Sequence, residues 1–324
     1  MTREALAFWI TGPAAGEIRA EPVLEPGPGE VLVRTLYSAV SRGTEKLVFE
    51  GRVPRDQFGR MRAPFQAGDL PGPVKYGYLS VGVVDAGPAE LVGRTVFCLY
   101  PHQTVYVAPV DQVTPVPDDV PPRRAVLAGT VETAVNALWD APPLLGDRVT
   151  VVGAGMVGCC LARLLAGIRG VHTTLVDIEQ SRAVVATALG VAFALPADAP
   201  VEQDLVFHTS ATAAGLQTSL GLLATDGTVV ELSWYGDSDV RLSLGGDFHS
   251  RRLAVRASQV GGIAPGARSR WNHAHRRALA LDLLRDPAFD HLLTGTSAFA
   301  DLPEVMKHLA AGSLDGTCQT ISYE

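Results

Sequence analysis

A glycine pattern between a buried strand and a helix constrains the fold of this chain more than any other feature. The segment RVTVVGAGMVGCCLARLLAG, residues 148–167, places Gly153, Gly155 and Gly158 directly after an apolar run of strand length and at the start of an apolar helical run. The first glycine permits a tight turn, the second lets the backbone approach a pyrophosphate, and the third lets the helix pack closely on the strand. Exposed N–H groups and the helix dipole hold phosphate charge, so the segment predicts a dinucleotide-binding turn.

Residues on either side of this turn complete the predicted cofactor site. Met156 and Val157 lie between the last two glycines and are expected to contact the cofactor. The next strand, TTLVD, ends in Asp177, whose carboxylate can bond the adenosine ribose and repels a 2′-phosphate. NAD is therefore favoured over NADP. Arg182 lies one helical turn into the following element, where it either contacts the adenosine end of the cofactor or faces solvent.

Strands and helices keep alternating after this point, as they do in a parallel sheet with right-handed crossovers. DLVFHTSA and TVVELSWYG predict two further strands, and AAGLQTSLGLLATDG predicts a helix that ends near Gly227. Ligands of such sheets lie beyond the carboxyl ends of the strands. We therefore expect Thr209, Ser210, Leu232 and Ser233 to border the nicotinamide half of the cofactor.

The residues before and after the alternating segment differ from it in composition. Residues 1–120 are dense in Pro and Gly between short runs of alternating apolar residues, which predicts an antiparallel, barrel-like β domain. Residues 292–324 have a strand–helix–strand pattern and are expected to return to that domain. The sequence thus predicts an α/β protein with two domains, a β barrel from residues 1–120 and 292–324 and a doubly wound parallel sheet from residues 121–291.

Charge and hydropathy limit the partners of the chain. Acidic residues outnumber Lys and Arg by 34 to 27, which disfavours a nucleic-acid surface, because such a surface needs a concentrated basic face. No stretch approaches 18 uninterrupted apolar residues and the N-terminus lacks a signal-peptide pattern, so we expect a cytoplasmic protein without a membrane partner. The four cysteines form no Cys-x-x-Cys pair, and we expect reduced, structural thiols.

The order of these parts resembles the medium-chain dehydrogenase/reductase superfamily over nearly the whole chain. The likeness is carried by GDRVTVVGAGMVG at the phosphate turn, and by RGTE, GYLSVGVVDAG and VETAVNALW elsewhere. The resemblance implies a GroES-like barrel domain, a Rossmann domain, and hydride transfer between a nicotinamide cofactor and a small-molecule substrate. It also implies a homodimer, formed through the sheet edge near RLAVRASQVGG.

The zinc ligands of that superfamily are missing from the matching positions. The cysteine that precedes Gly-Thr-acid is Arg42, the His-Glu pair is Tyr78 and Leu79, and the third ligand position is Gly129. The four-cysteine structural site is missing too, since residues 85–105 contain a single cysteine. Zinc needs several thiolate or imidazole ligands. Residue by residue, the resemblance therefore implies an enzyme without zinc.

One catalytic hydroxyl of the family is retained. Thr44 falls where the family keeps a Ser or Thr that bonds the substrate oxygen, whereas the relay histidine three residues later is Leu47. Proton delivery must therefore follow another route. Arg42 carries a permanent charge at the vacated ligand position, where it either binds a substrate carboxylate or oxygen, or pairs with Glu45.

Two further side chains could offset the loss of a Lewis acid. Tyr78 offers a phenol that can act as a general acid if Lys75 lowers its pKa, or it is a packing aromatic. Glu132 lies near the third ligand position, where it either takes part in the reaction or only places negative charge at a helix N-terminus.

These observations support one main function and leave alternatives open. The main hypothesis is a zinc-independent, NAD(H)-dependent oxidoreductase acting on a carbonyl, alcohol or imine of a small polar substrate. A quinone or enoyl reductase is an alternative, although such enzymes commonly use NADPH, which Asp177 disfavours. A protein that binds dinucleotide without turnover is another. GTEKLVFEG also resembles bacteriochlorophyllide dehydrogenases, over too short a stretch to specify a substrate.

Overall fold

The computed structural model describes residues 2–323, and their contacts divide into two units. Unit 1 comprises the residues up to Gly129, Arg277–Arg285 and the residues from Leu293 onward, and unit 2 comprises Thr130–Arg276 and Asp286–Leu292. The border at residue 293 lies within one residue of the predicted one, whereas the border predicted at residue 120 falls after Gly129, and Arg277–Arg285 was predicted to belong to the other domain. The reason is a set of contacts that follow no sequence pattern: Arg124 donates to the carbonyl of Leu284, and Arg277 to that of Gln112.

Unit 1 is built from two sheets whose strands pair mainly in antiparallel fashion. One sheet has the order β2-β1-β5-β4; the other has the order β16-β17-β3-β6-β7-β9, with β8 also paired to β3. The strands are β1 Thr2–Gly12, β2 Ala15–Leu24, β3 Glu30–Ala39, β4 Ala67–Gly68, β5 Val74–Lys75, β6 Ser80–Ala86, β7 Thr95–Cys98, β8 Val105–Pro109, β9 Val113–Pro115, β16 Leu293–Ala298 and β17 Cys318–Ser322. Short helices α1 Thr44–Phe49 and α2 Pro122–Ala125 connect them.

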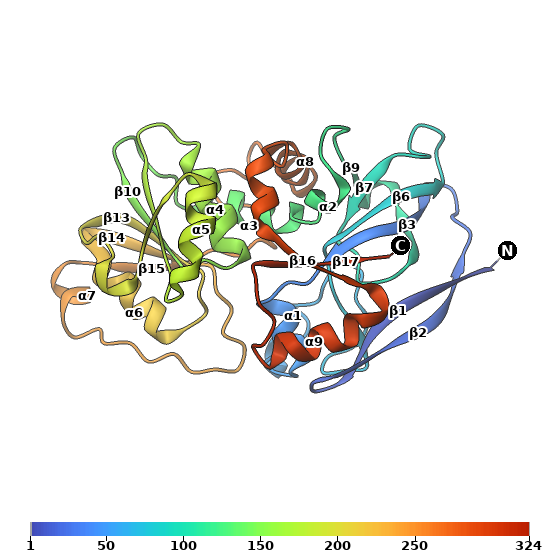
Figure 1. Cartoon of the computed structure of the whole chain (residues 1–324), viewed down its shortest axis with the longest axis horizontal. Coiled ribbons are helices and arrows are strands. Elements are labelled where there is room, and N and C mark those ends of the chain that lie inside the picture. Colours follow the sequence, from blue (N-terminus) through green and yellow to red (C-terminus); the bar gives the residue numbers. More distant parts are fainter. Residues whose placement is uncertain (1, 324) are drawn as a thin grey trace. The chain divides into compact units, whose positions relative to one another are not determined.

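The end of the chain forms the expected strand, helix and strand. Strand β17 pairs antiparallel with β3, and β16 pairs in parallel with β17. Helix α9, Leu302–Ala310, lies between them in sequence and packs against α1 and β2, where Figure 1 shows it in red. The tail is therefore joined to the first β region by backbone hydrogen bonds as well as by packing.

Unit 2 is a parallel sheet of the order β12-β11-β10-β13-β14-β15. Its strands are β10 Arg148–Val152, β11 His172–Val176, β12 Ala192–Ala194, β13 Gln203–His208, β14 Leu223–Glu231 and β15 Ala254–Ala257 (Figure 1). Its helices are α3 Ala128–Asp140, which starts in unit 1, and α4 Met156–Ala166, α5 Ala183–Leu189, α6 Ala213–Leu222, α7 Asp247–Ser250 and α8 His273–Leu283, which ends in unit 1. Single 3₁₀ segments lie at Arg55–Gln57, Val110–Gln112, Gln180–Arg182, Pro196–Asp198, Pro287–Leu292 and Phe299–Asp301.

The strand order confirms the predicted α/β fold and locates a ligand edge. The chain runs from β10 outward through β11 and β12 on one side, then returns to β13 and runs outward on the other. The order therefore reverses between β10 and β13, and the carboxyl ends of these two strands form the crevice where ligands of such sheets bind. The phosphate turn follows β10, so it lies at this edge.

One predicted boundary is wrong. The helix expected to end near Gly227 ends at Leu222, because β14 begins at Leu223. Leu223 is fully buried in the apolar cluster beneath α6 and aligns with Gln203 of β13. Burial at this position favours the extended conformation over one more helical turn. No helix among residues 2–323 combines the length and the apolar composition that crossing a membrane requires.

Candidate active site

The three glycines of the phosphate turn have the environments that the sequence predicts. Gly153 has φ +110°, and a β-carbon there would lie 2.8 Å from the backbone nitrogen of Ser210. A β-carbon on Gly158 would lie 1.9 Å from the carbonyl oxygen of Gly153. A β-carbon on Gly155, by contrast, would meet no atom within 4 Å. The turn is thus packed where it touches the protein and open where a pyrophosphate would approach, directly before α4 begins at Met156.

Asp177 lies immediately after β11 and is fixed to the phosphate turn. Its Oδ2 accepts the N–H of Ala154 at 2.6 Å, and its Oδ1 accepts the N–H of Glu179 at 3.0 Å. Each oxygen keeps a lone pair that can accept a ribose hydroxyl. Arg182 ends the 3₁₀ segment that follows. Burial raises the pKa of the Cys159 thiol to about 12; the positive charge of Arg182 lowers this pKa and the negative charge of Asp177 raises it, so both charges lie near the thiol. Both predicted adenosine-side residues therefore lie near the start of α4.

The residues after β13 and β14 also gather at the predicted edge. Thr209 donates its hydroxyl to the carbonyl of Gly153 at 2.8 Å, which joins the end of β13 to the phosphate turn. The N–H of Leu232 donates to the carbonyl of His208, and the hydroxyl of Ser233 accepts the N–H of Ala211. Ala211 has φ +54°, a strained conformation for a residue with a side chain, which is common at ligand sites.

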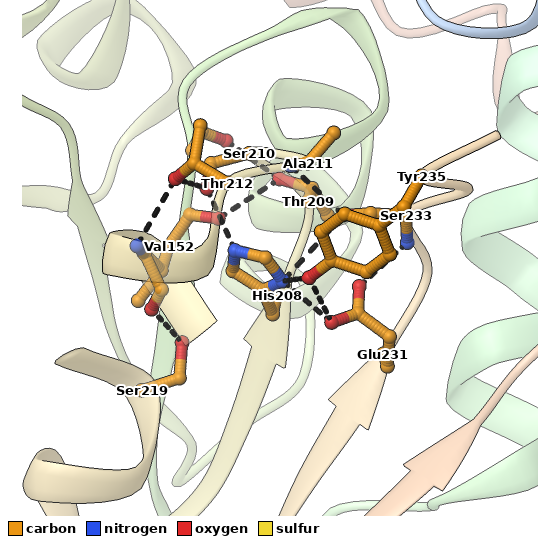
Figure 2. A network of polar contacts seen from close by, with 12 residues as sticks. Val152, His208, Thr209, Ser210, Ala211, Thr212, Ser219, Glu231, Ser233 and Tyr235 are labelled. Carbon is orange, nitrogen blue, oxygen red and sulfur yellow. Dashed lines mark hydrogen bonds and ion pairs between the residues drawn. The ribbon is translucent and has the colours of Figure 1, made fainter. Parts of the chain in front are cut away.

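A polar chain that sequence reasoning missed lies at the same edge (Figure 2). His208, with no exposed surface, places Nδ1 2.7 Å from Glu231 Oε2 and Nε2 2.6 Å from Ser210 Oγ. Ser210 Oγ lies 3.0 Å from Thr212 Oγ1, and Tyr235 donates its hydroxyl to Glu231 at 2.9 Å. The available signal was a polar residue directly after the apolar run of each strand, His208 after LVF and Glu231 after VV.

In unit 1, the retained hydroxyl of Thr44 belongs to a second polar cluster. Thr44 is the first residue of α1, and its hydroxyl and that of Ser41 lie close enough to the phenol of Tyr78 to lower the pKa of that phenol by hydrogen bonding. Burial raises the pKa of Tyr78 well above its usual value, and the negative charge of Glu45 raises it further. Three of the predicted catalytic residues, Thr44, Glu45 and Tyr78, therefore lie together.

The expectation that Lys75 lowers the pKa of Tyr78 is wrong. Lys75 donates to Glu21 Oε2 at 2.7 Å and to Gln103 Oε1 at 2.5 Å. Its charge is compensated by Glu21, and it does not figure among the groups that shift the pKa of Tyr78. The phenol therefore stays protonated near neutral pH, so it can donate a hydrogen bond but does not release its proton readily.

Glu45 has a partner that the sequence did not suggest. Its Oε2 lies 2.8 Å from Nε2 of His102, and its Oε1 accepts the N–H of Ser41 at 2.9 Å. His102 Nδ1 lies 2.7 Å from the hydroxyl of Ser38. Arg42, which was weighed as the partner of Glu45, donates instead to the carbonyl of Leu314 at 2.7 Å. This hydrogen bond anchors Arg42 to the C-terminal segment of unit 1.

The side chains at the family's zinc positions do not fit zinc. Arg42 and Tyr78 offer a guanidinium and a protonated phenol, Leu79 is buried, and a β-carbon on Gly129 would lie 2.6 Å from a methyl of Leu79. Zinc sites use thiolate, imidazole or carboxylate ligands, and none stands at these positions.

Glu132 has a different role from the two that the sequence suggested. It is buried and pairs with Arg276 at 3.2 Å. Arg276 also donates to Asn136 Oδ1 at 2.7 Å and to the carbonyl of Val260 at 2.6 Å. Glu132 is thus part of a buried ion pair that joins α3 to the segment after β15. A preference for negative charge at a helix N-terminus does not explain the position of this carboxylate.

Two curated proteins are similar in sequence to parts of this chain. An uncharacterized zinc-type alcohol dehydrogenase-like protein of Haemophilus influenzae is 34% identical over 89 residues, 28% of this chain and 26% of that protein. The 2-desacetyl-2-hydroxyethyl bacteriochlorophyllide A dehydrogenase of Rhodobacter capsulatus is 30% identical over 172 residues, 50% of this chain and 52% of that protein. The matches therefore span about a quarter and about half of these relatives. No protein-family model matches the chain.

Solved structures match the chain over almost its full length. A short chain alcohol dehydrogenase of Escherichia coli in complex with NADH has a TM-score of 0.77 at 17% identity, covering 99% of both chains. A zinc-binding dehydrogenase of Sinorhizobium meliloti bound to NADP, described as putative, has a TM-score of 0.79 at 16% identity, also covering 99% of both chains. At these identities the likeness establishes the fold.

Proposed function

On the premise that this chain belongs to the medium-chain dehydrogenase/reductase superfamily, by its fold and its curated relatives, we propose that it is an NAD(H)-dependent oxidoreductase. It transfers a hydride to or from the carbon of a carbonyl, alcohol or imine in a small polar substrate, and it does so without zinc. The observation that carries the proposal is the phosphate turn, open at Gly155 and bordered by Asp177 and the strand ends of unit 2.

The choice of NAD over NADP rests on the position of Asp177. Its carboxylate is held by the N–H groups of Ala154 and Glu179, so it cannot turn away from the adenosine ribose without losing two hydrogen bonds. A 2′-phosphate would bring two negative groups together at this point. Ribose hydroxyls, in contrast, can donate to it. When bound, the cofactor supplies the site that accepts or gives the hydride.

The chemistry without zinc rests on the hydroxyl cluster of unit 1. Tyr78 stays protonated and is bonded to Thr44 and Ser41, so the cluster offers hydrogen-bond donors toward the oxygen of a substrate. Preorganised donors can stabilise the charge that develops on such an oxygen in the transition state. Arg42 at the vacated ligand position supports acidic substrates, because its guanidinium is permanently charged.

Cofactor titrations test the first half of the proposal. Binding of NADH and NADPH is followed by nicotinamide fluorescence for the wild type and for Asp177→Ala. We expect the wild type to prefer NADH by at least about tenfold, and the variant to lose that preference because the repelling carboxylate is gone. A wild type that binds neither dinucleotide, or one that prefers NADPH, contradicts the proposal.

A substrate screen tests the second half. Single-turnover reduction of bound NAD is measured over a broad set of alcohols, polyols and amines, and the reverse reaction over carbonyls, with zinc content determined on the same preparation. Thr44→Val and Tyr78→Phe are expected to slow turnover about 10²-fold or more while NADH affinity is kept, because each removes a donor to the reacting oxygen. Tight NADH binding with no turnover on any candidate favours the non-catalytic alternative, and stoichiometric zinc contradicts the zinc-free mechanism.

The proposal includes a homodimer formed through β15. This strand ends the parallel sheet of unit 2, and all four of its residues are exposed. A strand edge with unpaired backbone groups is a surface on which a second copy can continue the sheet. Analytical ultracentrifugation of the wild type and of Val255→Pro, which removes one edge N–H, tests this: the wild type should sediment as a dimer and the variant as a monomer.

A further inference from the structure

We propose that His208, backed by Glu231, holds the Ser210 hydroxyl as a hydrogen-bond acceptor for the nicotinamide riboside half of the dinucleotide, and that protonation of His208 removes this acceptor. The inference rests on the proposed cofactor site and adds to it a positioning residue and a dependence on pH. The chain of side chains that carries it is drawn in Figure 2.

The contacts of Glu231 fix the tautomer of His208. The carboxylate accepts the hydroxyl of Tyr235 at 2.9 Å and the N–H of Ser233 at 2.7 Å, and His208 Nδ1 lies 2.7 Å away. Both oxygens of Glu231 therefore act as acceptors. Against a carboxylate, Nδ1 of the imidazole must carry a proton. In the neutral ring Nε2 is then a bare acceptor.

The direction of the next hydrogen bonds follows from this tautomer. Ser210 must donate its single hydroxyl proton to Nε2 of His208, 2.6 Å away. Thr212 already accepts the N–H of Gly215, as the N-cap of α6, so its own hydroxyl proton is available to Ser210 at 3.0 Å. The Ser210 oxygen then has one filled and one unfilled lone pair. The unfilled pair accepts a donor from outside the chain.

Protonation of His208 reverses this arrangement. The imidazolium donates from Nε2 to Ser210, so the serine hydroxyl proton leaves this nitrogen. While Thr212 keeps donating to Ser210, both lone pairs of the serine oxygen are filled, and its proton turns outward so that the hydroxyl becomes a donor. The ionisable side chains in contact with the ring are Glu231 and Tyr235; α6 carries none, and on β10 the one ionisable residue, Arg148, lies at the far end and pairs with Asp204. Protonation of His208 itself therefore controls the change.

The position of Ser210 points to the nicotinamide half as the ligand. The sheet order β11-β10-β13 places Asp177 and Ser210 on opposite sides of the phosphate turn that follows β10. If Asp177 holds the adenosine ribose, the other half of the dinucleotide extends toward Ser210. That half carries two kinds of donor, the hydroxyls of the ribose and the amide of the nicotinamide, and either can meet the unfilled lone pair.

The test compares NAD with ADP, which lacks the nicotinamide riboside half. Dissociation constants are measured calorimetrically between about pH 5 and pH 8, the range in which histidine ordinarily titrates. The variants are His208→Gln, whose amide oxygen can accept from Ser210 without titrating, and the control His249→Gln, which changes an exposed histidine on α7. At each pH, the ratio of the wild-type dissociation constant to that of the variant cancels the effect of titrating the ligand phosphates.

In wild type and in the control, NAD affinity is expected to fall about tenfold toward the acid end, the effect of losing one hydrogen bond in a partly buried site. At every pH, His208→Gln should keep the NAD affinity that it has at the alkaline end. For ADP, the ratio of wild type to variant should stay constant across the pH range. Unchanged ADP binding also shows that the phosphate turn is folded. Ser210→Ala should lower NAD affinity about tenfold at the alkaline end and leave no pH dependence.

Two outcomes overturn the inference while the proposed function stands. One is a wild type that binds NAD with the same pH dependence as His208→Gln, and the other is an ADP ratio that changes with pH as the NAD ratio does. A wild type that binds neither ligand at any pH contradicts the proposed function and this inference together.

If NAD shows the expected dependence on pH, ADP-ribose identifies the donor, because it keeps the ribose and lacks nicotinamide. A pH effect that is retained with ADP-ribose assigns the donor to the ribose.

Discussion

Each unit of this protein contains a serine, a histidine and a glutamate in one hydrogen-bonded chain. In unit 1, His102 lies 2.7 Å from Ser38 and 2.8 Å from Glu45; in unit 2, His208 lies 2.6 Å from Ser210 and 2.7 Å from Glu231. The distances are nearly equal, although opposite ring nitrogens face the carboxylates.

The two Ser–His–Glu networks differ in the exposure of the serine. Ser38 is 1% exposed and its oxygen also contacts the hydroxyl of Tyr323 at 2.9 Å, so nothing outside the protein can reach it. Ser210 is half-buried and lies two residues after the end of β13, at the ligand edge. The same three residue types thus stabilise a core in one unit and present a hydroxyl in the other. The exposure of the serine decides between these two roles, because the residue types are the same in both networks.

The largest expected difference between the units appears at alkaline pH. Burial raises the pKa of five tyrosines in unit 1 and of one in unit 2: Tyr76, Tyr78, Tyr100, Tyr106 and Tyr323, and Tyr235. Above about pH 10 an unfolded tyrosine loses its proton while the folded one keeps it. Each buried phenol of unit 1 therefore lowers the free energy of unfolding by up to about 1.4 kcal/mol per further pH unit. Tyr235 contributes less, because it is only half-buried and solvent screens it. Unit 1 should lose stability several times as steeply as unit 2.

The cysteines report on each unit separately. Cys98 and Cys318 are buried in unit 1, and Cys159 and Cys160 in unit 2, so each pair reacts with iodoacetamide only when its own unit opens. Mass spectrometry of alkylated peptides between about pH 9 and pH 12 should show the unit 1 cysteines reacting first, since tyrosines and thiols ionise in this range when exposed. Simultaneous labelling of all four cysteines contradicts the expectation.

Replacing each histidine by alanine should lower the free energy of unfolding by different amounts in the two units. His102→Ala leaves the carboxylate of Glu45, which is 2% exposed, without the hydrogen bond to His102, and should cost unit 1 about 3–5 kcal/mol. His208→Ala leaves Glu231 with Tyr235 and Ser233 as donors, and should cost unit 2 only about 1–3 kcal/mol. Urea unfolding followed by alkylation of the same cysteines measures both values. A greater loss for His208→Ala than for His102→Ala reverses the comparison.

The smallest effect on stability is expected for Ser210, and comparing it with Ser38 distinguishes the functions of the two Ser–His–Glu networks. Ser38→Ala removes a buried partner of both His102 and Tyr323, and should lower the free energy of unfolding by about 1–3 kcal/mol without changing NADH affinity. Ser210→Ala should change stability by about 0.5 kcal/mol or less, because a half-buried hydroxyl can be replaced by water. Urea unfolding and NADH fluorescence titration on both variants check this. Equal behaviour of the two variants would remove the distinction between a structural and a ligand-facing chain.

The sequence identified the parts of the fold that depend on local pattern. The phosphate turn, the acid after the second strand and the alternation of strands and helices each arise from short-range physics: glycine conformation, helix dipole and hydrophobic period. The structure confirms the resulting α/β fold and places Asp177 and Ser210 at one edge of the sheet. The boundary at Leu222 was missed because burial of Leu223 in the core overrides a helical pattern.

Partner choice was decided only by the tertiary structure. The sequence suggested Arg42 for Glu45 and Lys75 for Tyr78, since neighbours in sequence were the only candidates in view, whereas Glu45 pairs with His102, 57 residues away, and Lys75 with Glu21. His208 and Glu231 are 23 residues apart and meet because adjacent parallel strands end in register. A buried charge must be compensated by whichever opposite group the fold brings within reach, and that group is set by long-range packing. The sequence alone therefore determined the edge where a dinucleotide can bind, and the fold determined which side chains are held there and which groups they contact.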